Sequence, residues 1–232
     1  MSIRPIKMTS QAQPTMEGAG VHLHRVFGFG DTDPFDPFLM MDDFRNDNPQ
    51  EYLKGFPWHP HRGIETITYV LKGNVEHSDS LGNTGVLSDG DVQWMTAGSG
   101  IIHQEMPTGN ADGQMHGFQL WANLPREQKM CTPRYQDVAS EHITSLTDDD
   151  GTHIRVIAGD YRGYRGPIDG IDTDPLYLDI ALPANTSRRF PFDTRRQGFA
   201  YIFEGSASFG NASAPFGINV EKEFAGEEMK IR

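Results

Sequence analysis

The stretch 58-WHPHRGIETITYVLKG-73 sets two histidines one residue apart and then runs into a segment rich in β-branched and aromatic residues. Such segments are typical of β-strands, and similar ones recur at short intervals with Gly, Asn and Asp between them. Helical periodicity is scarce, so the spacing predicts an all-β sandwich or barrel. The candidate strand segments are 64-IETITYVLKG-73, 74-NVEHSDSLGN-83, 90-GDVQWMTAG-98 and 115-MHGFQLWANLP-125, with a hairpin turn expected at 81-LGNTG-85.

An internal repeat predicts two related β-domains. The string 69-YVLKG-73 is echoed by 201-YIFEG-205, and 56-FPW-58 is echoed by 190-FPF-192. Self-similarity of this kind indicates a duplicated structural unit. We therefore expect an N-terminal domain over residues 1–135 and a C-terminal domain over residues 136–232.

The two copies are not equivalent. The second copy has Pro, Asp or Arg where the first has His59 and His61, so a metal is expected only in the N-terminal domain. Only 27 residues follow Gly205, whereas the first copy continues for nearly fifty residues after Gly73. We expect a C-terminal barrel that is incomplete, with an open sheet edge.

Two short motifs carry the candidate metal ligands. Residues two apart on a strand point to the same face, so His59 projects with His61, and His103 projects with Glu105. If the two strands pair, three imidazoles and one carboxylate converge, a set that suits Fe(II), Mn(II), Ni(II), Cu(II) or Zn(II). Glu65 competes with Glu105 as the fourth ligand. It lies an even number of residues after His61 and would share its face in a continuous strand, although Gly63 between them is a potential bulge.

The remaining histidines have weaker claims. His22 and His24 repeat the spacing without a second pair or a nearby carboxylate, so an exposed strand is the better interpretation. His77 is expected in a turn. His116 begins a strongly predicted strand. We expect it to be packed in the interior or to contact a metal ligand, and not to bind the metal itself. His142 and His153 are interpreted as surface residues.

Composition narrows the function classes. The chain has 232 residues, a net charge of −12 and an isoelectric point near 5.1, so unaided DNA binding is not expected. A single cysteine, Cys131, excludes an intrachain disulfide and a cysteine-based zinc site. The opening MSIRPIKMTS lacks an apolar core of signal-peptide length, and no run reaches membrane-span length. We expect a cytoplasmic protein without a membrane segment.

The motifs resemble a known family. The pattern of His59, His61 and Glu65, then Gly73, followed by Gly90, Gly98 and His103, is similar to the two-part cupin motif. More narrowly, the chain resembles the pirin family. The strings that carry this resemblance are 33-DPFDPFLMMDDF-44, 58-WHPHRGIETITYVLKGNVEHSDSLGN-83, 90-GDVQWMTAGSGIIHQEMP-107, 116-HGFQLWANLP-125 and 175-PLYLDIALP-183.

The resemblance implies two jelly-roll-like cupin barrels packed face to face, with one divalent metal in the first. It assigns the ligands to His59, His61, His103 and Glu105, which leaves Glu65 near the site or inside the barrel. Iron, as Fe(II), is the metal it implies most directly, with Mn, Ni, Cu, Co or Zn as alternatives. Members of this type continue further at the C-terminus than this chain does.

The implied activity is ring cleavage of a flavonol by a quercetin 2,3-dioxygenase-like oxidoreductase that uses O2. Glu105 would accept the substrate's proton. Candidates for a wall around a flat aromatic substrate are Met40, Met41, Phe56, Trp58 and Trp94, although barrel core is the better interpretation of any one of them taken alone. Two other hypotheses remain: an iron-dependent redox-sensing module that regulates a protein partner, either a transcription factor or a metabolic enzyme, and a structural cupin stapled by its metal. Oligomeric state is not predicted.

Overall fold

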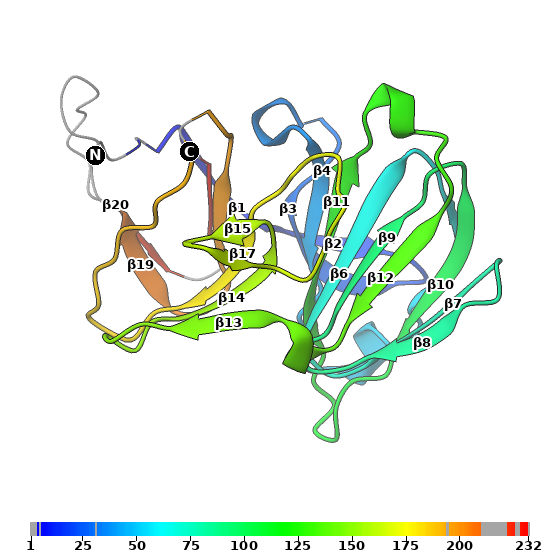
Figure 1. The fold of residues 1–232 in the computed structure, drawn as a ribbon. Coiled ribbons are helices and arrows are strands. Elements are labelled where there is room, and N and C mark those ends of the chain that lie inside the picture. Colours follow the sequence, from blue (N-terminus) through cyan, green and yellow to red (C-terminus); the bar gives the residue numbers. More distant parts are fainter. Residues whose placement is uncertain are drawn as a thin grey trace.

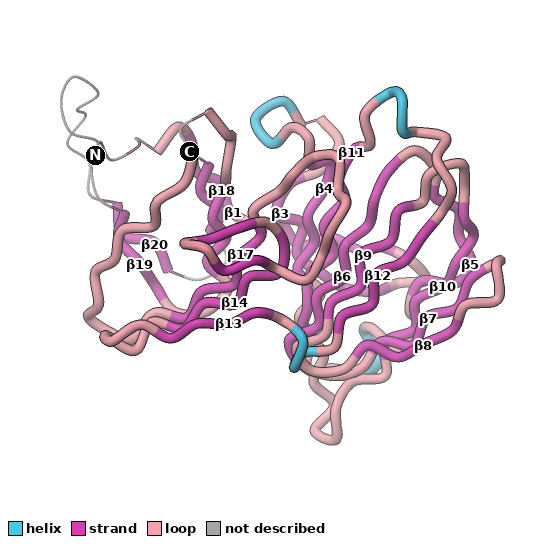
Figure 2. Tube along the Cα trace, viewed as in Figure 1, coloured by secondary structure: helices cyan, strands magenta, loops and turns pink. Residues whose placement is uncertain are grey.

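The computed structural model describes residues 4, 6–30, 32–193, 195–209, 222–225 and 228–231, with side chains as far as residue 209. Antiparallel strands make up nearly all regular structure in these ranges (Figure 1), which confirms the all-β prediction. Helical structure among the described residues is confined to short 3₁₀ turns (Figure 2), and none of it is long and apolar enough to cross a membrane. The turns are η1 (Asp33–Phe35), η2 (Pro49–Glu51), η3 (Arg126–Gln128) and η4 (Ser140–His142).

The largest sheet has seven strands in the order β12-β9-β6-β11-β4-β3-β2. β6, the strand predicted from the opening stretch, lies between β9 and β11 and pairs with both along most of its length. The sheet's strands are β2 (Gln13–Glu17), β3 (Val21–Phe27), β4 (Phe38–Asp43), β6 (Ile64–Lys72), β9 (Val92–Thr96), β11 (His116–Asn123) and β12 (Arg134–Val138).

A second sheet of four strands carries the histidine motifs, in the order β5-β10-β7-β8. β7 and β8 form the hairpin expected from 81-LGNTG-85, and the backbone N–H of Asp79 donates to the carbonyl of Asn83 across its turn. The strands are β5 (Phe56–His61), β7 (Val75–Asp79), β8 (Thr84–Leu87) and β10 (Ile101–Pro107). Residues of this sheet and of the large sheet line one shared cavity.

The C-terminal half is built from smaller sheets, which lie beside the large sheet in Figure 1. Their orders are β13-β14-β17, β15-β16, β1-β21-β18 and β19-β20. The strands are β1 (Met8–Gln11), β13 (Thr144–Thr147), β14 (His153–Ala158), β15 (Asp160–Tyr161), β16 (Tyr164–Arg165), β17 (Tyr177–Ala181), β18 (Phe199–Ile202), β19 (Ser206–Phe209), β20 (Lys222–Ala225) and β21 (Glu228–Ile231).

β6 shows how the sequence divides the large sheet into two faces. Its side chains alternate, as the period of a strand requires. Ile67 and Tyr69 belong to the main hydrophobic core, which the C-terminal residues Tyr177, Phe199 and Tyr201 cover. Thr68 points the other way, into the cavity. One face of the sheet therefore supports the C-terminal half, and the opposite face forms the candidate site.

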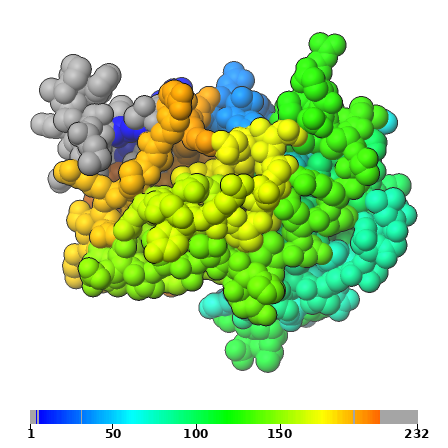
Figure 3. All heavy atoms as spheres, in the orientation of Figure 1, coloured from blue at the N-terminus to red at the C-terminus, as the bar shows by residue number. Residues whose placement is uncertain are grey.

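Partly buried polar contacts join the C-terminal half to the large sheet. The hydroxyl of Tyr69 donates to Asp179 at 2.6 Å and accepts from Arg155 at 2.8 Å. The hydroxyl of Tyr201 donates to Asp43 at 2.9 Å. Figure 3 shows the two halves as one continuous surface, with the yellow C-terminal segment lying directly against the green one.

The expected domain boundary falls inside a strand. β12 runs from Arg134 to Val138 and belongs to the large sheet, while β1, near the N-terminus, pairs with β21 in the C-terminal half. The repeated strings agree only in part. Gly73 and Gly205 both have positive φ, and each lies between two strands. In contrast, 56-FPW-58 is part of β5, whereas 190-FPF-192 is in no strand. The division at residue 135 remains a prediction.

Candidate metal centre

The structure brings His59, His61 and His103 together at one end of the cavity. β5 and β10 pair antiparallel, with His59 directly opposite His103 and His61 opposite Ile101. The ring centroids of the three histidines lie 4.5–4.9 Å apart. One nitrogen from each ring lies within 4.8 Å of the others. The two-residue spacing of His59 and His61 turns both side chains to the same face of β5, and the pairing of β5 with β10 adds His103.

Glu105 lies beside the cluster rather than within it. The pairing of β10 with β5 shifts register between His103 and Glu105, so that Glu105 faces Phe56. Its Oε2 is 3.9 Å from Nε2 of His103, and its Oε1 is 3.0 Å from the hydroxyl of Thr68. This places a nearly buried carboxylate next to three imidazoles. Its role as the fourth ligand stays a prediction.

Burial keeps two of the imidazoles neutral. It lowers the pKa of His61 to about 3, with further lowering from the nearby positive forms of His103 and His59. Burial also lowers the pKa of His103, although the Glu105 carboxylate opposes that shift. Since a metal binds the neutral imidazole, these pKa shifts suit a metal ligand set.

The hydrogen bonds of His59 define which nitrogen is free. Its Nδ1 is 2.9 Å from the carbonyl of Pro57, which can only accept, so the proton lies on Nδ1. The Nε2 lone pair then points at Nε2 of His103, 3.0 Å away. Metal–nitrogen bonds of about 2.0–2.1 Å put adjacent ligand atoms about 3 Å apart. The donor set therefore fits a divalent metal ion, and the pair His59–His103 has the spacing of adjacent ligands.

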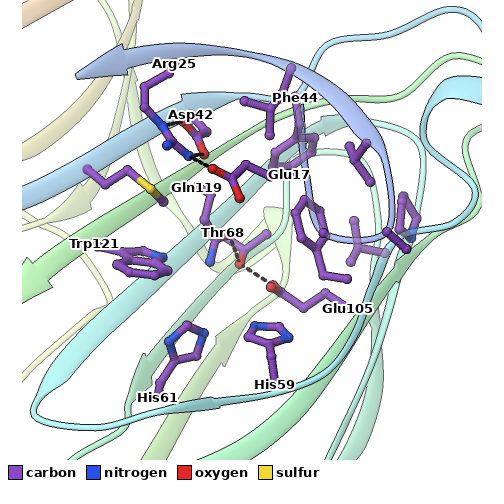
Figure 4. Close-up of a pocket in the computed structure, with 18 of the residues that line it drawn as sticks. Glu17, Arg25, Asp42, Phe44, His59, His61, Thr68, Glu105, Gln119 and Trp121 are labelled. Carbon is purple, nitrogen blue, oxygen red and sulfur yellow. Dashed lines mark hydrogen bonds and ion pairs between the residues drawn. The ribbon is translucent and has the colours of Figure 1, made fainter. Parts of the chain in front are cut away.

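Beyond the histidines extends a cavity of about 770 Å³ with a mainly apolar lining. Figure 4 shows His59 and His61 at one end, and Arg25 with Asp42 and Glu17 at the other. Arg25 binds both oxygens of Asp42 at 2.8 Å and one oxygen of Glu17 at 2.9 Å. This volume is large enough for a multi-ring ligand.

Two of the five candidates for an apolar wall line the cavity. Met40 and Phe56 line the cavity. Trp58 does not, since it is 54% exposed, and Met41 and Trp94 lie in the core on the opposite face of the large sheet. Strand alternation explains the positions of Met41 and Trp94. Met41 follows Met40 on β4 and therefore points away from the cavity, and Trp94 lies two residues after the core residue Val92 on β9 and shares its face.

Several cavity residues escaped the sequence analysis. Trp121 meets His61 edge to face, with ring centroids 4.9 Å apart. Gln119, Thr68 and Arg25 supply polar groups to the same cavity. Alternation along β11 could have identified two of them, since the core residues Phe118 and Leu120 flank Gln119 and set the inward parity for Trp121.

Glu65 is excluded from the ligand set. It is 1% exposed, on the face of β6 that carries the core residues Ile67 and Tyr69, and it accepts a hydrogen bond from Thr96 at 2.7 Å. The parity argument failed at Gly63, whose φ of +68° separates β5 from β6. Because the two strands belong to different sheets, the alternation of one does not continue into the other.

The other histidines lie outside the cluster. His22 and His24 are on strand β3, and His22 lies 3.5 Å from Glu51. The turn expected at His77 is wrong, because this residue is buried within β7 and stacks on Tyr135. His116 is packed, as expected: it contacts Arg45 and the ring of Phe203 on the face covered by the C-terminal half.

Comparison with known proteins places the chain in a family. The family model described as Pirin matches residues 20–122. A pirin-like protein from Caulobacter vibrioides is 46% identical over 206 residues, which cover 88% of this chain and 74% of that protein. The chain belongs to the pirin family.

Solved structures agree with this pirin assignment. The structure of GK1651 from Geobacillus kaustophilus matches with a TM-score of 0.80 and 32% identity, covering 100% of this chain and 86% of that one. A quercetin 2,3-dioxygenase from Acinetobacter baumannii matches with a TM-score of 0.74 and 27% identity, covering 99% of this chain and 79% of that one. The family predicted from the histidine motifs is thus confirmed.

Proposed function

We propose that this pirin is a metal-dependent dioxygenase that cleaves flavonols in the manner of a quercetin 2,3-dioxygenase. The observation that carries the proposal is the cluster of three histidines with a buried carboxylate at the end of a large, mainly apolar cavity. The likeness to the Acinetobacter quercetin 2,3-dioxygenase supports it. The proposed substrate is a flat, hydroxylated aromatic molecule together with O2.

In this proposal His59, His61, His103 and Glu105 hold one iron ion within a metal-binding domain over residues 1–135. The metal-free domain over residues 136–232 supports the large sheet from behind. When bound, the metal supplies a Lewis acid for the flavonol oxygens and a redox centre for O2. Imidazole ligands alone do not select iron over Mn, Ni, Cu, Co or Zn.

The protein's own groups bind the substrate and move its proton. Glu105 accepts the proton of the flavonol 3-hydroxyl, for which a carboxylate within hydrogen-bond reach is required. Trp121 and Phe56 bound the cavity near the histidines and hold the aromatic rings away from water. Arg25, Asp42 and Glu17 offer polar contacts to hydroxyl groups at the far end.

A turnover assay tests this function. Purified protein loaded with Fe(II) is mixed with quercetin in air, and loss of the flavonol absorbance is followed together with carbon monoxide release. We expect both signals in the wild type and neither in His103→Ala. Metal-loaded protein that consumes no flavonol would contradict the proposed activity. Regulation of a protein partner would then be the hypothesis to test.

A further inference from the structure

The hydroxyl of Thr68 lies between two side-chain oxygens and cannot serve both. Its Oγ1 is 3.0 Å from Oε1 of Glu105 and 2.7 Å from Oε1 of Gln119. A threonine hydroxyl has one hydrogen to donate, and neither an ionised carboxylate nor an amide oxygen can donate one back. Thr68 is buried, so its hydroxyl depends mainly on these two partners.

The orientation of the Gln119 amide resolves this conflict. Amide oxygen and nitrogen are nearly indistinguishable in shape, so their placement follows from the hydrogen-bond pattern. With Oε1 toward Thr68, Nε2 makes no hydrogen bond within the described part of the chain. With the amide reversed, Nε2–H donates to Thr68, and the Thr68 hydrogen is free for Glu105. The neighbouring Asp42 does not need the amide, because Arg25 binds both of its oxygens.

A protonated Glu105 would also supply the missing hydrogen, because its carboxyl group could donate to the Thr68 hydroxyl. A carboxylate that ligates a metal must be ionised, however, so that arrangement conflicts with the proposed ligand set. The direction of donation therefore follows from the metal site. It runs from Gln119 through Thr68 to Glu105.

We propose that Thr68 and Gln119 are positioning residues for Glu105. Together they hold Oε1, which leaves Oε2 directed toward the histidines, 3.9 Å from Nε2 of His103. The inference rests on the proposed metal site. Thr68 and Gln119 are register partners on β6 and β11 of the large sheet, whereas Glu105 is on β10 of the four-stranded sheet (Figure 4). The chain of hydrogen bonds thus connects the two sheets across the cavity.

The chain offers a matched control at Thr96. Its hydroxyl donates to Oε1 of Glu65 at 2.7 Å, a buried threonine–carboxylate pair on the opposite face of the same sheet. Thr68→Val and Thr96→Val each remove one hydroxyl and keep the side-chain shape. Only the first acts on the candidate metal centre. Thr68→Ser retains the hydroxyl and should behave like the wild type.

The test uses Co(II) as the probe, without flavonol. Affinity is measured by competition with a chromophoric chelator, and ligand geometry by the visible spectrum of the bound Co(II). Losing a hydrogen bond that orients a ligand typically weakens metal binding by about 10–100-fold. We expect that loss and a changed spectrum in Thr68→Val, rescue in Thr68→Ser, and wild-type values in Thr96→Val.

Wild-type affinity and spectrum in Thr68→Val would overturn the inference, as would an equal loss in Thr96→Val. If Thr68→Val does not fold, Gln119→Leu carries the test, and wild-type Co(II) binding in that variant would overturn the role of the amide. Absence of Co(II) binding in the wild type would overturn the metal site and this inference together. Absence of quercetin turnover in a protein that binds Co(II) would contradict the proposed activity alone.

Discussion

Tyr69→Phe should destabilise the protein without disturbing the metal centre. Tyr69 is buried on the face of β6 opposite Thr68, and its hydroxyl makes two hydrogen bonds to charged groups, Asp179 and Arg155. The substitution removes one oxygen and creates almost no cavity. Asp179 then loses a 2.6 Å bond, whereas Arg155 keeps its bonds to Gly90 and Ser140.

The size of the loss follows from these partners. Hydrogen bonds to charged groups contribute about 1.5–3 kcal/mol each. Asp179 and Arg155 are only half-buried, so water recovers part of the loss, and we expect about 2–3 kcal/mol in total. In a chain of this size each kcal/mol lowers Tm by about 2–4 °C, which gives a decrease of about 4–12 °C.

Thermal unfolding followed by circular dichroism measures this decrease in the metal-free protein. Tyr52→Phe is the control, because its buried hydroxyl donates to the neutral carbonyl of Gly113 at 2.8 Å and should contribute about 1 kcal/mol. A Tm for Tyr69→Phe within about 1 °C of the wild type, less than the ~2 °C that one kcal/mol gives, would refute the contribution assigned to this contact. Weakened Co(II) binding in Tyr69→Phe would refute the separation of the two faces.

Two further predictions concern pH. Burial raises the pKa of Glu65, so the folded state disfavours the ionised carboxylate, and the wild type loses stability as pH rises above the ordinary Glu pKa of about 4.3. The stability of Glu65→Gln relative to the wild type, measured by denaturant unfolding, should therefore increase between acidic and neutral pH. A stability difference that stays constant with pH would contradict this. Burial, together with the positive charges of Arg45 and Lys72, lowers the pKa of His116 to about 3. Below about pH 6.5 this histidine is therefore protonated in the unfolded chain but stays neutral in the folded chain. The metal-free wild type should therefore lose stability as pH falls from about 6.5, with a shallower slope in His116→Gln, and equal slopes would count against the neutral buried histidine.

Local patterns in the sequence were sufficient for the strands and for the two histidine motifs, whereas the histidine cluster was predicted on the condition that the two strands pair. The alternation that places His59 beside His61 depends only on strand geometry, and the direct pairing of His59 with His103 completes the cluster. The hairpin after β7 followed from its turn residues. The pirin family was predicted from the resemblance of five longer strings, and the spacing of the histidines and glycines pointed only to the cupin motif.

Features that depend on the pairing of distant strands were not accessible. Strand alternation alone left Glu65 in competition with Glu105, because it was carried through Gly63, where the chain passes from one sheet to another. Met41 and Trp94 could not be assigned to the cavity or to the core, because the sequence does not say which face of a strand buried on both sides meets the cavity. The contact of Thr68 with Glu105 joins two sheets and has no local signature.

The most direct test of the account is the metal content of the purified protein compared with that of His103→Ala. Elemental analysis after equilibration with Fe(II) and gel filtration should find one metal ion per chain in the wild type. Removing one imidazole of a three-histidine site should abolish retention, while circular dichroism shows an intact β-fold. Retention of a full equivalent of metal by His103→Ala would contradict the proposed centre.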